Sequence, residues 1–324
     1  MLNPNGDTVK QTVRIASRGS DLALWQAHHV RDLILRADPA AEVDIQVVHT
    51  TGDRITDVPL SRIGDRGLFT KEIDFTLLEG RADLAVHSLK DVPTELPAGL
   101  VLAAVTERED PRDVLLCRPG LDADLDSLPE GARVGTSSLR RRAQLRARRP
   151  DVEVIDLRGN LNTRLARLDA GDYDAIILAA AGVIRLGWRE RVSAWLEPRD
   201  WLPAVGQGAL ALVIRDDDAA TRAALAPLHH AESAACVVAE RTLLHALEGG
   251  CQIPIGALAT VEGDTLHLDA LVAGLEGTPL LRAADHAPLD TAAELGARVA
   301  GVLLRRGARD VLASIRTPVP IPSP

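Results

Sequence analysis

Short apolar runs alternate with helix-like apolar patterns over the first two thirds of the chain. Residues 13–17 predict a strand, and Ser20 is a candidate N-cap for the helix that follows it. Residues 43–49 and 83–87 predict two further strands, and Thr70 is the predicted cap of a helix that runs to Leu78 between them. Strands that alternate with helices are typical of α/β domains with a mainly parallel sheet, and we expect that fold class here.

The alternation continues through two further strand and helix units. In VGTSSLRRRAQLRARRP, residues 134–150, the hydroxyl residues predict a helix cap, and Leu139, Ala143 and Ala147 predict the apolar side of the helix. Residues 152–157 predict the next strand. We therefore expect two helix starts at the carboxyl ends of neighbouring strands, where open α/β sheets bind ligands.

Three segments depart from this pattern. Residues 50–67 are polar and without periodicity, which is typical of a functional loop. Residues 107–116, EREDPRDVLL, predict a crossover or hinge. From residue 231 onward the pattern predicts an Ala-rich helix, a hairpin around Gly263-Asp264, a helix at 291–305 and a last strand, which indicates a smaller α+β domain.

Length and composition narrow the class of protein. With 324 residues, 46% of them hydrophobic and 26% charged, the chain is expected to form two or three globular domains. The polar N-terminus does not resemble a secretion signal and the apolar run at 175–184 is too short to span a bilayer, so we expect a cytoplasmic protein without membrane contact. The three cysteines are odd in number and lack metal-binding spacing, so we expect no metal site and no disulfide framework.

Charge is concentrated in one stretch. Nine arginines lie between residues 134 and 167 against three acidic residues, a local balance of +6 in a chain of net charge −9. Arg140 and Arg141 fall in the first turn of a predicted helix, where each cation costs ~0.3–1 kcal/mol against the helix dipole. A bound anion would remove that cost, so the stretch indicates an anion site. The alternatives are a solvated basic helix face and a nucleic-acid surface, although the acidic net charge and the 2% aromatic content disfavour nucleic acid.

Two further segments carry reactive side chains. Lys90 and Asp91 stand next to each other where a predicted strand ends, and an ordinary turn with a solvated ion pair is the alternative reading. Cys251 follows two glycines at the end of a predicted helix. The absence of side-chain bulk beside its sulfur would admit a large group, but a C-capping glycine with an incidental cysteine is the alternative.

The order of these segments resembles the porphobilinogen deaminase (hydroxymethylbilane synthase) family. The similarity runs from Arg14 to about Ile315. The matching segments are GDRGLFTKEIDFTLLEGRADLAVHSLKDVP (64–93), EREDPRDVLL, VGTSSLRRRAQLRARRP, LRGNLNTR, LPAVGQGAL and LEGGCQIPIG. The resemblance implies two periplasmic-binding-protein-like α/β lobes around a cleft and a smaller C-terminal α+β domain. The implied boundaries are 10–106 with 208–228 for the first domain, 107–207 for the second and 229–324 for the third.

The resemblance also implies a reaction. In this family a dipyrromethane cofactor is bound as a thioether to the cysteine that matches Cys251, and four porphobilinogen molecules are added to it in turn, each losing ammonia, before hydrolysis releases hydroxymethylbilane. Positive charge develops on pyrrole nitrogens during each addition, so Asp91 is the expected catalytic residue. Every porphobilinogen unit carries two carboxylates, which arginine binds with a planar bidentate fork.

Residue matches to the family distribute the remaining roles. The residues expected to bind the cofactor are Ser88, Lys90, Thr136, Ser138, Arg140, Arg141 and Arg164. The residues expected to bind the substrate and growing chain are Arg18, Ser20, Phe69, Arg158 and Arg185. For Phe69, which would pack on a pyrrole ring, a buried hydrophobic staple is the alternative role. We expect Arg142, Arg146, Arg148 and Arg149 to form a solvated helix face.

The resemblance implies a monomer that binds only small molecules. The main alternative from another class is a non-catalytic anion-binding or ligand-sensing protein, because two α/β lobes with arginines at strand ends suit that function as well. It predicts no covalent group on Cys251.

Overall fold

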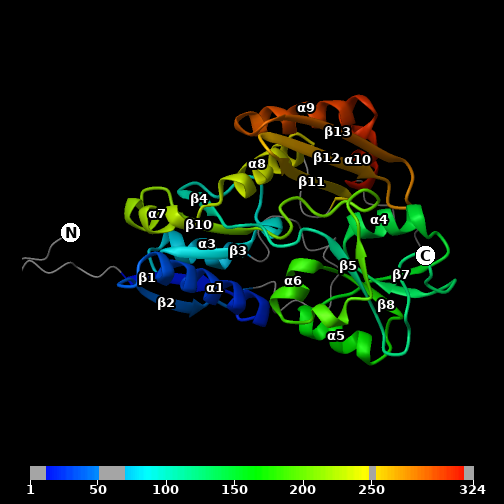
Figure 1. Ribbon diagram of the computed structural model, residues 1–324, viewed down its shortest axis with the longest axis horizontal. Coiled ribbons are helices and arrows are strands. Elements are labelled where there is room, and N and C mark those ends of the chain that lie inside the picture. Colours follow the sequence, from blue (N-terminus) through cyan, green and yellow to red (C-terminus); the bar gives the residue numbers. More distant parts are fainter. Residues whose placement is uncertain (1–11, 51–69, 248–252, 317–324) are drawn as a thin grey trace, which may run out of the picture. The chain divides into compact units, whose positions relative to one another are not determined.

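The alternating apolar runs of the first hundred residues form a five-stranded sheet in the computed structural model, which describes residues 12–50, 70–247 and 253–316. The strand order is β2-β1-β3-β10-β4, with β1 parallel to β2 and β3, and β10 antiparallel to β3 and β4 (Figure 1). The strands are β1 (Thr12–Ser17), β2 (Glu42–Val47), β3 (Leu84–Ser88), β4 (Leu100–Val105) and β10 (Leu210–Arg215). The helices are α1 (Asp21–Ala37), α3 (Lys71–Leu78), the 3₁₀ turn η2 (Leu89–Asp91), α7 (Ala219–Leu225) and η4 (Ala226–Leu228).

One face of this sheet packs against α1 through an apolar core. Val30 and Ile34 of α1 are buried in the same cluster as Ile15 of β1, Leu84 of β3 and Leu212 of β10. Burial of side chains of this size contributes roughly 1.5–3 kcal/mol each. The return strand β10 is thus held in the sheet by core packing as well as by its backbone hydrogen bonds.

A second five-stranded sheet repeats this arrangement with other strands. Its order is β7-β6-β8-β5-β9, with β6 parallel to β7 and β8, and β5 antiparallel to β8 and β9. The strands are β5 (Asp113–Cys117), β6 (Arg133–Gly135), β7 (Glu153–Ile155), β8 (Ala175–Ala179) and β9 (Ala194–Leu196). The helices are α4 (Leu139–Arg148), α5 (Leu161–Asp169), α6 (Ala180–Arg185) and the 3₁₀ turn η3 (Arg189–Arg191). Both faces of this sheet are buried, since alternate residues of β5 and β8 belong to two different core clusters.

The C-terminal part forms a three-stranded antiparallel sheet covered by helices. Its order is β11-β12-β13, and α8, α9 and α10 enclose one buried cluster with it. The elements are α8 (Ala231–Ala246), β11 (Ile255–Glu262), β12 (Thr265–Ala273), β13 (Leu280–Pro288), the 3₁₀ turn η5 (Leu289–Thr291), α9 (Ala292–Arg305) and α10 (Ala308–Arg316). Helix α4 packs on this sheet, because Ala143 shares a buried cluster with Leu258 and Leu271.

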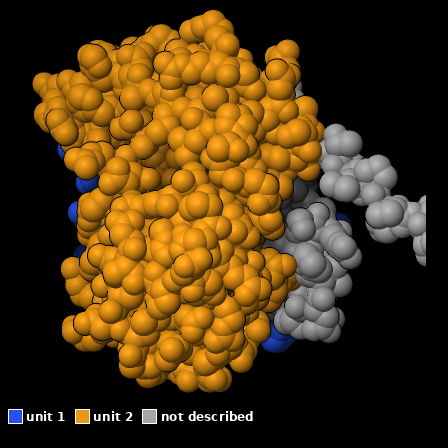
Figure 2. Space-filling model, turned by 90° about the vertical axis from the view of Figure 1, so that its right-hand side faces the viewer, with its two compact units in different colours: residues 1–56, 67–108, 209–234 blue, residues 57–66, 109–208, 235–324 orange. Residues whose placement is uncertain are grey.

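The contacts divide the chain into two compact units, which Figure 2 colours separately. Unit 1 contains residues 1–56, 67–108 and 209–234, and unit 2 contains 57–66, 109–208 and 235–324. Unit 2 therefore holds both the second five-stranded sheet and the three-stranded sheet. The predicted fold class, two α/β sheets with a smaller α+β part, is confirmed. The expectation of mainly parallel sheets was wrong, because β10 and β5 each pair antiparallel with both of their neighbours. The division into three domains stays a prediction.

Three local predictions were wrong. The segment after α9 is the helix α10 rather than a last strand, because Val311 and Leu312 bury one helical face in the C-terminal core. Thr70 stands at the N-cap of α3 but makes no side-chain capping bond. Ala147 of α4 is exposed, since the buried side of that helix includes its arginines.

No helix in the described ranges is both long enough and apolar enough to cross a membrane.

Candidate active site

The predicted site residues of unit 1 gather at one edge of its sheet. Arg18 and Ser20 follow β1, Ser88 ends β3, and Lys90 and Asp91 lie in η2 directly after it. Because β1 and β3 are parallel, their carboxyl ends share an edge. Ser20 caps α1, its Oγ accepting a hydrogen bond from the backbone N of residue 23 at 3.4 Å, as its sequence position predicts.

Helix α1 also orients the end of β3. The buried Gln26 side chain donates from Nε2 to Ser88 Oγ at 2.8 Å. Next to it, burial lowers the pKa of His87 to about 4, and the charge of Arg18 lowers it further in the same direction. His87 is therefore neutral near pH 7. Asp91 is exposed at this edge, where a ligand can reach its carboxylate.

The predicted site residues of unit 2 follow the parallel strands β6, β7 and β8. Thr136 comes directly after β6, and its Oγ1 accepts a hydrogen bond from the backbone N of Ser138 at 3.2 Å. Ser138 in turn caps α4, its Oγ accepting from the backbone N of Arg141 at 3.5 Å. The two hydroxyls thus shape the turn that leads into the arginine-bearing helix.

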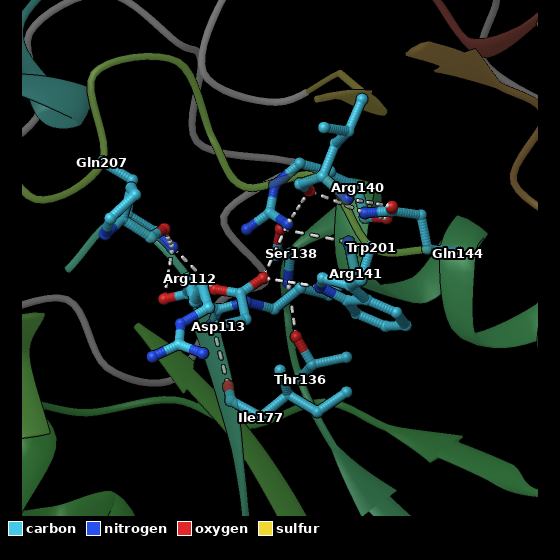
Figure 3. A network of polar contacts seen from close by, with 12 residues as sticks. Arg112, Asp113, Thr136, Ser138, Arg140, Arg141, Gln144, Ile177, Trp201 and Gln207 are labelled. Carbon is cyan, nitrogen blue, oxygen red and sulfur yellow. Dashed lines mark hydrogen bonds and ion pairs between the residues drawn. The ribbon is translucent and has the colours of Figure 1, made fainter. Parts of the chain in front are cut away.

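Arg140 and Arg141 converge on one buried carboxylate, that of Asp113 (Figure 3). Arg140 Nη1 donates to Oδ2 and Arg141 Nη2 donates to Oδ1, each at 2.7 Å. Trp201 Nε1 also donates to Oδ2, at 2.8 Å, and Gln207 Nε2 donates to Oδ1 at 2.9 Å. Each carboxylate oxygen therefore accepts one charged and one neutral hydrogen bond.

Burial gives this cluster its electrostatic character. Asp113 is 0% exposed, Arg140 4% and Arg141 6%. Burial alone would raise the pKa of Asp113, but attraction and hydrogen bonds from both guanidinium groups lower it well below its usual range. Burial lowers the pKa of Arg140, and Asp113 opposes that effect. Two arginines and one aspartate leave a surplus positive charge in a desolvated place, which favours binding of an anion.

Arg158, Arg164 and Arg185 lie near the ends of the next two strands. Arg158 and Arg164 are half-buried, and Arg164 Nε donates to the carbonyl of Gly159 at 2.8 Å. Gly159 has a φ of +102° in the turn between them, a conformation that favours glycine. Arg185 is buried and donates from Nη2 to the carbonyl of residue 208 at 2.7 Å. Burial lowers the pKa of Arg185 to about 10, against the opposing effect of a nearby glutamate, so it remains a cation near pH 7.

Comparison with known protein families places this chain in one of them. Residues 13–223 match the dipyrromethane cofactor binding domain of porphobilinogen deaminase, and residues 234–305 match the C-terminal domain of the same family. The chain belongs to the porphobilinogen deaminase family. The resemblance inferred from the sequence is therefore confirmed, and with it a role in tetrapyrrole synthesis.

Solved structures that align with this chain are only distantly similar to it. The periplasmic domain of BvgS from Bordetella pertussis aligns at 16% identity with a TM-score of 0.41, covering 67% of this chain and 86% of that one. The alkanesulfonate-binding protein SsuA from Xanthomonas axonopodis aligns at 14% identity with a TM-score of 0.36, covering 73% and 75%. Both TM-scores lie below 0.5, so the fold assignment rests on the strand order and the family match.

The arginines predicted to form a solvated face of α4 differ from one another. Arg148 is exposed and pairs with Asp126 at 2.6 Å. For Arg149 the prediction was wrong, because its side chain is only 13% exposed and it donates to the backbone carbonyls of Leu125 and Leu128. In this deaminase-family chain Arg149 therefore ties α4 to the preceding loop.

Sequence reasoning missed the acceptor at the centre of the unit 2 cluster. Asp113 stands in the segment that was predicted to be a crossover or hinge, but it begins the buried strand β5. Because β5 runs antiparallel to β8, Asp113 lies opposite Ala179, at the carboxyl end of β8. An aspartate placed directly before the apolar run VLLC was the available signal. Gln207 and Trp201 were missed as well. Gln207 lies in LPAVGQGAL, one of the segments that match the family, whereas Trp201 directly precedes it.

Several predicted residues cannot be placed in this site. Phe69 and Cys251 lie outside the described residues. The predicted residues after β1 and β3 belong to unit 1, whereas those after β6, β7 and β8 belong to unit 2. Within the described ranges, no group of three or more His, Cys, Asp or Glu side chains is placed to hold a metal ion.

Proposed function

We propose that this chain joins four porphobilinogen molecules head to tail on a dipyrromethane primer, with loss of ammonia at each step, and releases hydroxymethylbilane by hydrolysis. Membership of the porphobilinogen deaminase family supports this function. The primer is a thioether on Cys251. In the proposed division the first domain is residues 10–106 with 208–228, the second is residues 107–207, and the third, residues 229–324, carries the primer.

The buried pair Arg140 and Arg141 is the observation that carries the proposal. Porphobilinogen and dipyrromethane present acetate and propionate groups, and a guanidinium binds a carboxylate through two parallel hydrogen bonds. The pair retains donors for such a group, since the side-chain hydrogen bonds from Arg140 to described residues are all donated by Nη1. Arg141 Nε is buried without a hydrogen-bond partner among the described residues. The residues present therefore fit a polycarboxylate cofactor.

The proposed binding roles follow the two groups of side chains. Arg140, Arg141 and Arg164 bind carboxylates of the cofactor, and hydroxyl and amino groups supply further donors to it. Those donors are Ser88, Lys90, Thr136 and Ser138. Arg18, Ser20, Arg158 and Arg185 bind the incoming substrate and the growing chain, with Phe69 against a pyrrole ring. When bound, the dipyrromethane supplies the pyrrole carbon to which the first unit is joined, and each later unit is joined to the one before it.

Asp91 is the proposed catalytic residue. It lies in η2, exposed at the carboxyl edge of the unit 1 sheet. An ionised carboxylate there stabilises the positive charge that develops on pyrrole nitrogens as ammonia leaves. The same oxygen atoms can accept a pyrrole N–H hydrogen bond and move a proton during the addition.

Substitution of Asp91 by Asn tests this role, because the exchange removes the charge and keeps the shape. We expect Asp91→Asn protein to retain the covalent cofactor and to lose about 10²–10⁴-fold in the rate of ammonia release from porphobilinogen. Glu95→Gln removes another exposed carboxylate a short distance along the chain and is the matched control. Near-normal ammonia release by Asp91→Asn would refute the assignment. Binding of porphobilinogen without any ammonia release by the unaltered protein would favour an anion-binding function instead.

A further inference from the structure

We propose that Asp113 is a positioning residue for cofactor and substrate carboxylates, acting through Arg140 and Arg141. The proposal rests on the proposed function and extends it to a residue that itself contacts no ligand. Asp113 fixes the orientation of both guanidinium groups before a ligand arrives. It also cancels one of their two charges, so that the pair offers a single net positive charge to one carboxylate.

The surroundings of Asp113 hold its carboxylate in place. Its two oxygens accept four hydrogen bonds in all, and two of these come from the neutral donors Trp201 and Gln207. Gln207 Nε2 also donates to the backbone carbonyl of residue 111 at 2.8 Å, which ties it to the chain just before β5. A carboxylate with this many buried partners has no acceptor capacity left for a ligand. Its effect on a ligand must therefore pass through the arginines.

Each guanidinium is fixed by a second contact as well. Arg140 Nη1 donates to the carbonyl of Leu202 at 2.8 Å, and Arg141 Nη1 donates to the carbonyl of Ile177 at 2.8 Å. The edge of Arg140 formed by Nε and Nη2 makes no hydrogen bond to any described residue. That edge has the geometry that receives both oxygens of a carboxylate. The bonds to Asp113 and Leu202 thus preset the orientation of the edge that remains.

The net charge of the cluster also supports a positioning role for Asp113. With Asp113 ionised, the three side chains sum to +1, and one ligand carboxylate neutralises the cluster. In an Asp113→Asn protein the same desolvated place would hold two cations and no anion. The amide would also direct an NH₂ donor at one of the guanidinium groups. Both changes push the arginines apart, and misplacement of a binding group by 1 Å can cost about 10²-fold in function.

Asp174 provides a matched control within the same sheet. It also lies between two arginines, Arg118 Nε at 3.1 Å and Arg133 Nε at 3.3 Å. Asp174 directly precedes β8, so it lies at the opposite edge of the sheet from Asp113. Asp174→Asn therefore removes an aspartate shared by two arginines without touching the proposed carboxylate site.

The test measures how much of each purified, folded variant carries the covalent cofactor. Intact-mass spectra give the modified fraction, and thermal unfolding confirms a cooperative fold. We expect Asp113→Asn to carry at least about tenfold less adduct than the unaltered protein, and Asp174→Asn to be fully modified and to unfold cooperatively, although at a lower temperature than the unaltered protein. Equal modification of both variants would overturn the proposal. A lack of adduct in the unaltered protein would instead contradict the proposed function.

A milder variant covers the case in which Asp113→Asn does not fold. Trp201→Phe keeps a ring in the core and removes only the neutral donor to Asp113 Oδ2. We expect the modified Trp201→Phe enzyme to show a raised KM for porphobilinogen with kcat within about twofold, because the arginines bind the carboxylate in the ground state and the transition state alike. An unchanged KM together with full modification would overturn the proposal.

Discussion

Asp83 and Asp174 occupy the same position in the two five-stranded sheets, each directly before the third parallel strand. The backbone N of Asp83 donates to the carbonyl of Arg14 at 2.9 Å, and the backbone N of Asp174 donates to the carbonyl of Arg133 at 2.9 Å. In return the backbone N of each arginine donates to the carboxylate, at 3.0 Å and 2.9 Å. The two sheets therefore share these reciprocal arginine–aspartate hydrogen bonds as well as a strand order. We call the Arg14–Asp83 and Arg133–Asp174 pairs the clamps.

The clamp predicts how each unit responds to loss of its aspartate. A second arginine from the antiparallel strand joins each clamp: Arg215 at the end of β10 contacts Asp83, and Arg118 directly after β5 contacts Asp174. We expect Asp83→Asn and Asp174→Asn each to lower the free energy of unfolding by about 1–2 kcal/mol, measured by chemical denaturation. The control is Asp44→Asn, because the side chain of Asp44 is exposed. No loss of stability in either aspartate variant would mean that the clamps are incidental.

The two ends of α4 are predicted to respond differently to loss of an arginine. Arg140→Leu leaves Asp113 buried with one guanidinium, so we expect a loss of about 3–5 kcal/mol in the free energy of unfolding and poor attachment of the cofactor. Arg148→Leu removes an exposed pair with Asp126 and should cost about 1 kcal/mol or less, with normal attachment. Urea unfolding and intact mass give the two quantities. Equal effects of the two substitutions would contradict the division of the helix.

His87 predicts a pH dependence of stability. Its ordinary pKa of 6.5 falls to about 4 on folding because the side chain is buried. Between these values the unfolded chain binds more protons than the folded one, so the free energy of unfolding rises with pH across that window. The contribution is fully lost below about pH 4 and amounts to at most ~3 kcal/mol.

Denaturant titrations of a His87→Leu variant measure this contribution. Burial raises the pKa of Asp74 to about 6, which makes stability fall with rising pH over part of the same window, so the difference between the variant and the parent protein is the informative quantity. We expect the free energy of unfolding of the variant minus that of the parent protein to fall as pH rises from 4.5 to 7. The exposed His28→Gln is the control and should leave the slope unchanged. A pH-independent difference for His87→Leu would contradict the assignment.

Glu240 is predicted to hold the loop before β10 to the C-terminal sheet. Its fully buried carboxylate accepts from the backbone N of Gly206 at 2.7 Å and from the backbone N of Ala259 at 2.8 Å. Glu240→Gln presents an NH₂ group to one of these donors, so we expect a loss of about 1–3 kcal/mol in the free energy of unfolding. Glu232→Gln, exposed on the same helix, is the control for thermal and chemical unfolding. If both variants unfold alike, the carboxylate does not hold the loop.

Helix caps could be predicted from the sequence, because a capping side chain bonds to residues next to it in the chain. Ser20 and Ser138 each precede a helix and cap it. The strand order could not be read in this way, because β10 joins strands that lie more than a hundred residues earlier in the sequence. The repeated order of the two sheets became visible only with the pairings.

The buried face of α4 shows why the site itself was only partly predictable. Periodicity assigned Leu139, Ala143 and Ala147 to the core because arginine ordinarily stays in water. Arg140 and Arg141 are buried nevertheless, since Asp113 from a distant strand compensates their charge. A pairing between residues so far apart in sequence leaves no local pattern. The internal counter-ion of Arg140 and Arg141 was therefore missed, and the anion site at this helix start stays a prediction.

The attachment of the cofactor to Cys251 is the central claim, and intact-mass analysis of the purified protein tests it most directly. We predict a mass above the 34.6 kDa of the unmodified chain by two porphobilinogen units less two molecules of ammonia, one lost when the first unit is joined to the sulfur and one when the second unit is joined to the first. The addition should be absent from Cys251→Ser and present in Cys117→Ser and Cys236→Ser, whose sulfurs are buried. A folded protein that releases ammonia from porphobilinogen while its mass equals that of the bare chain would contradict the account.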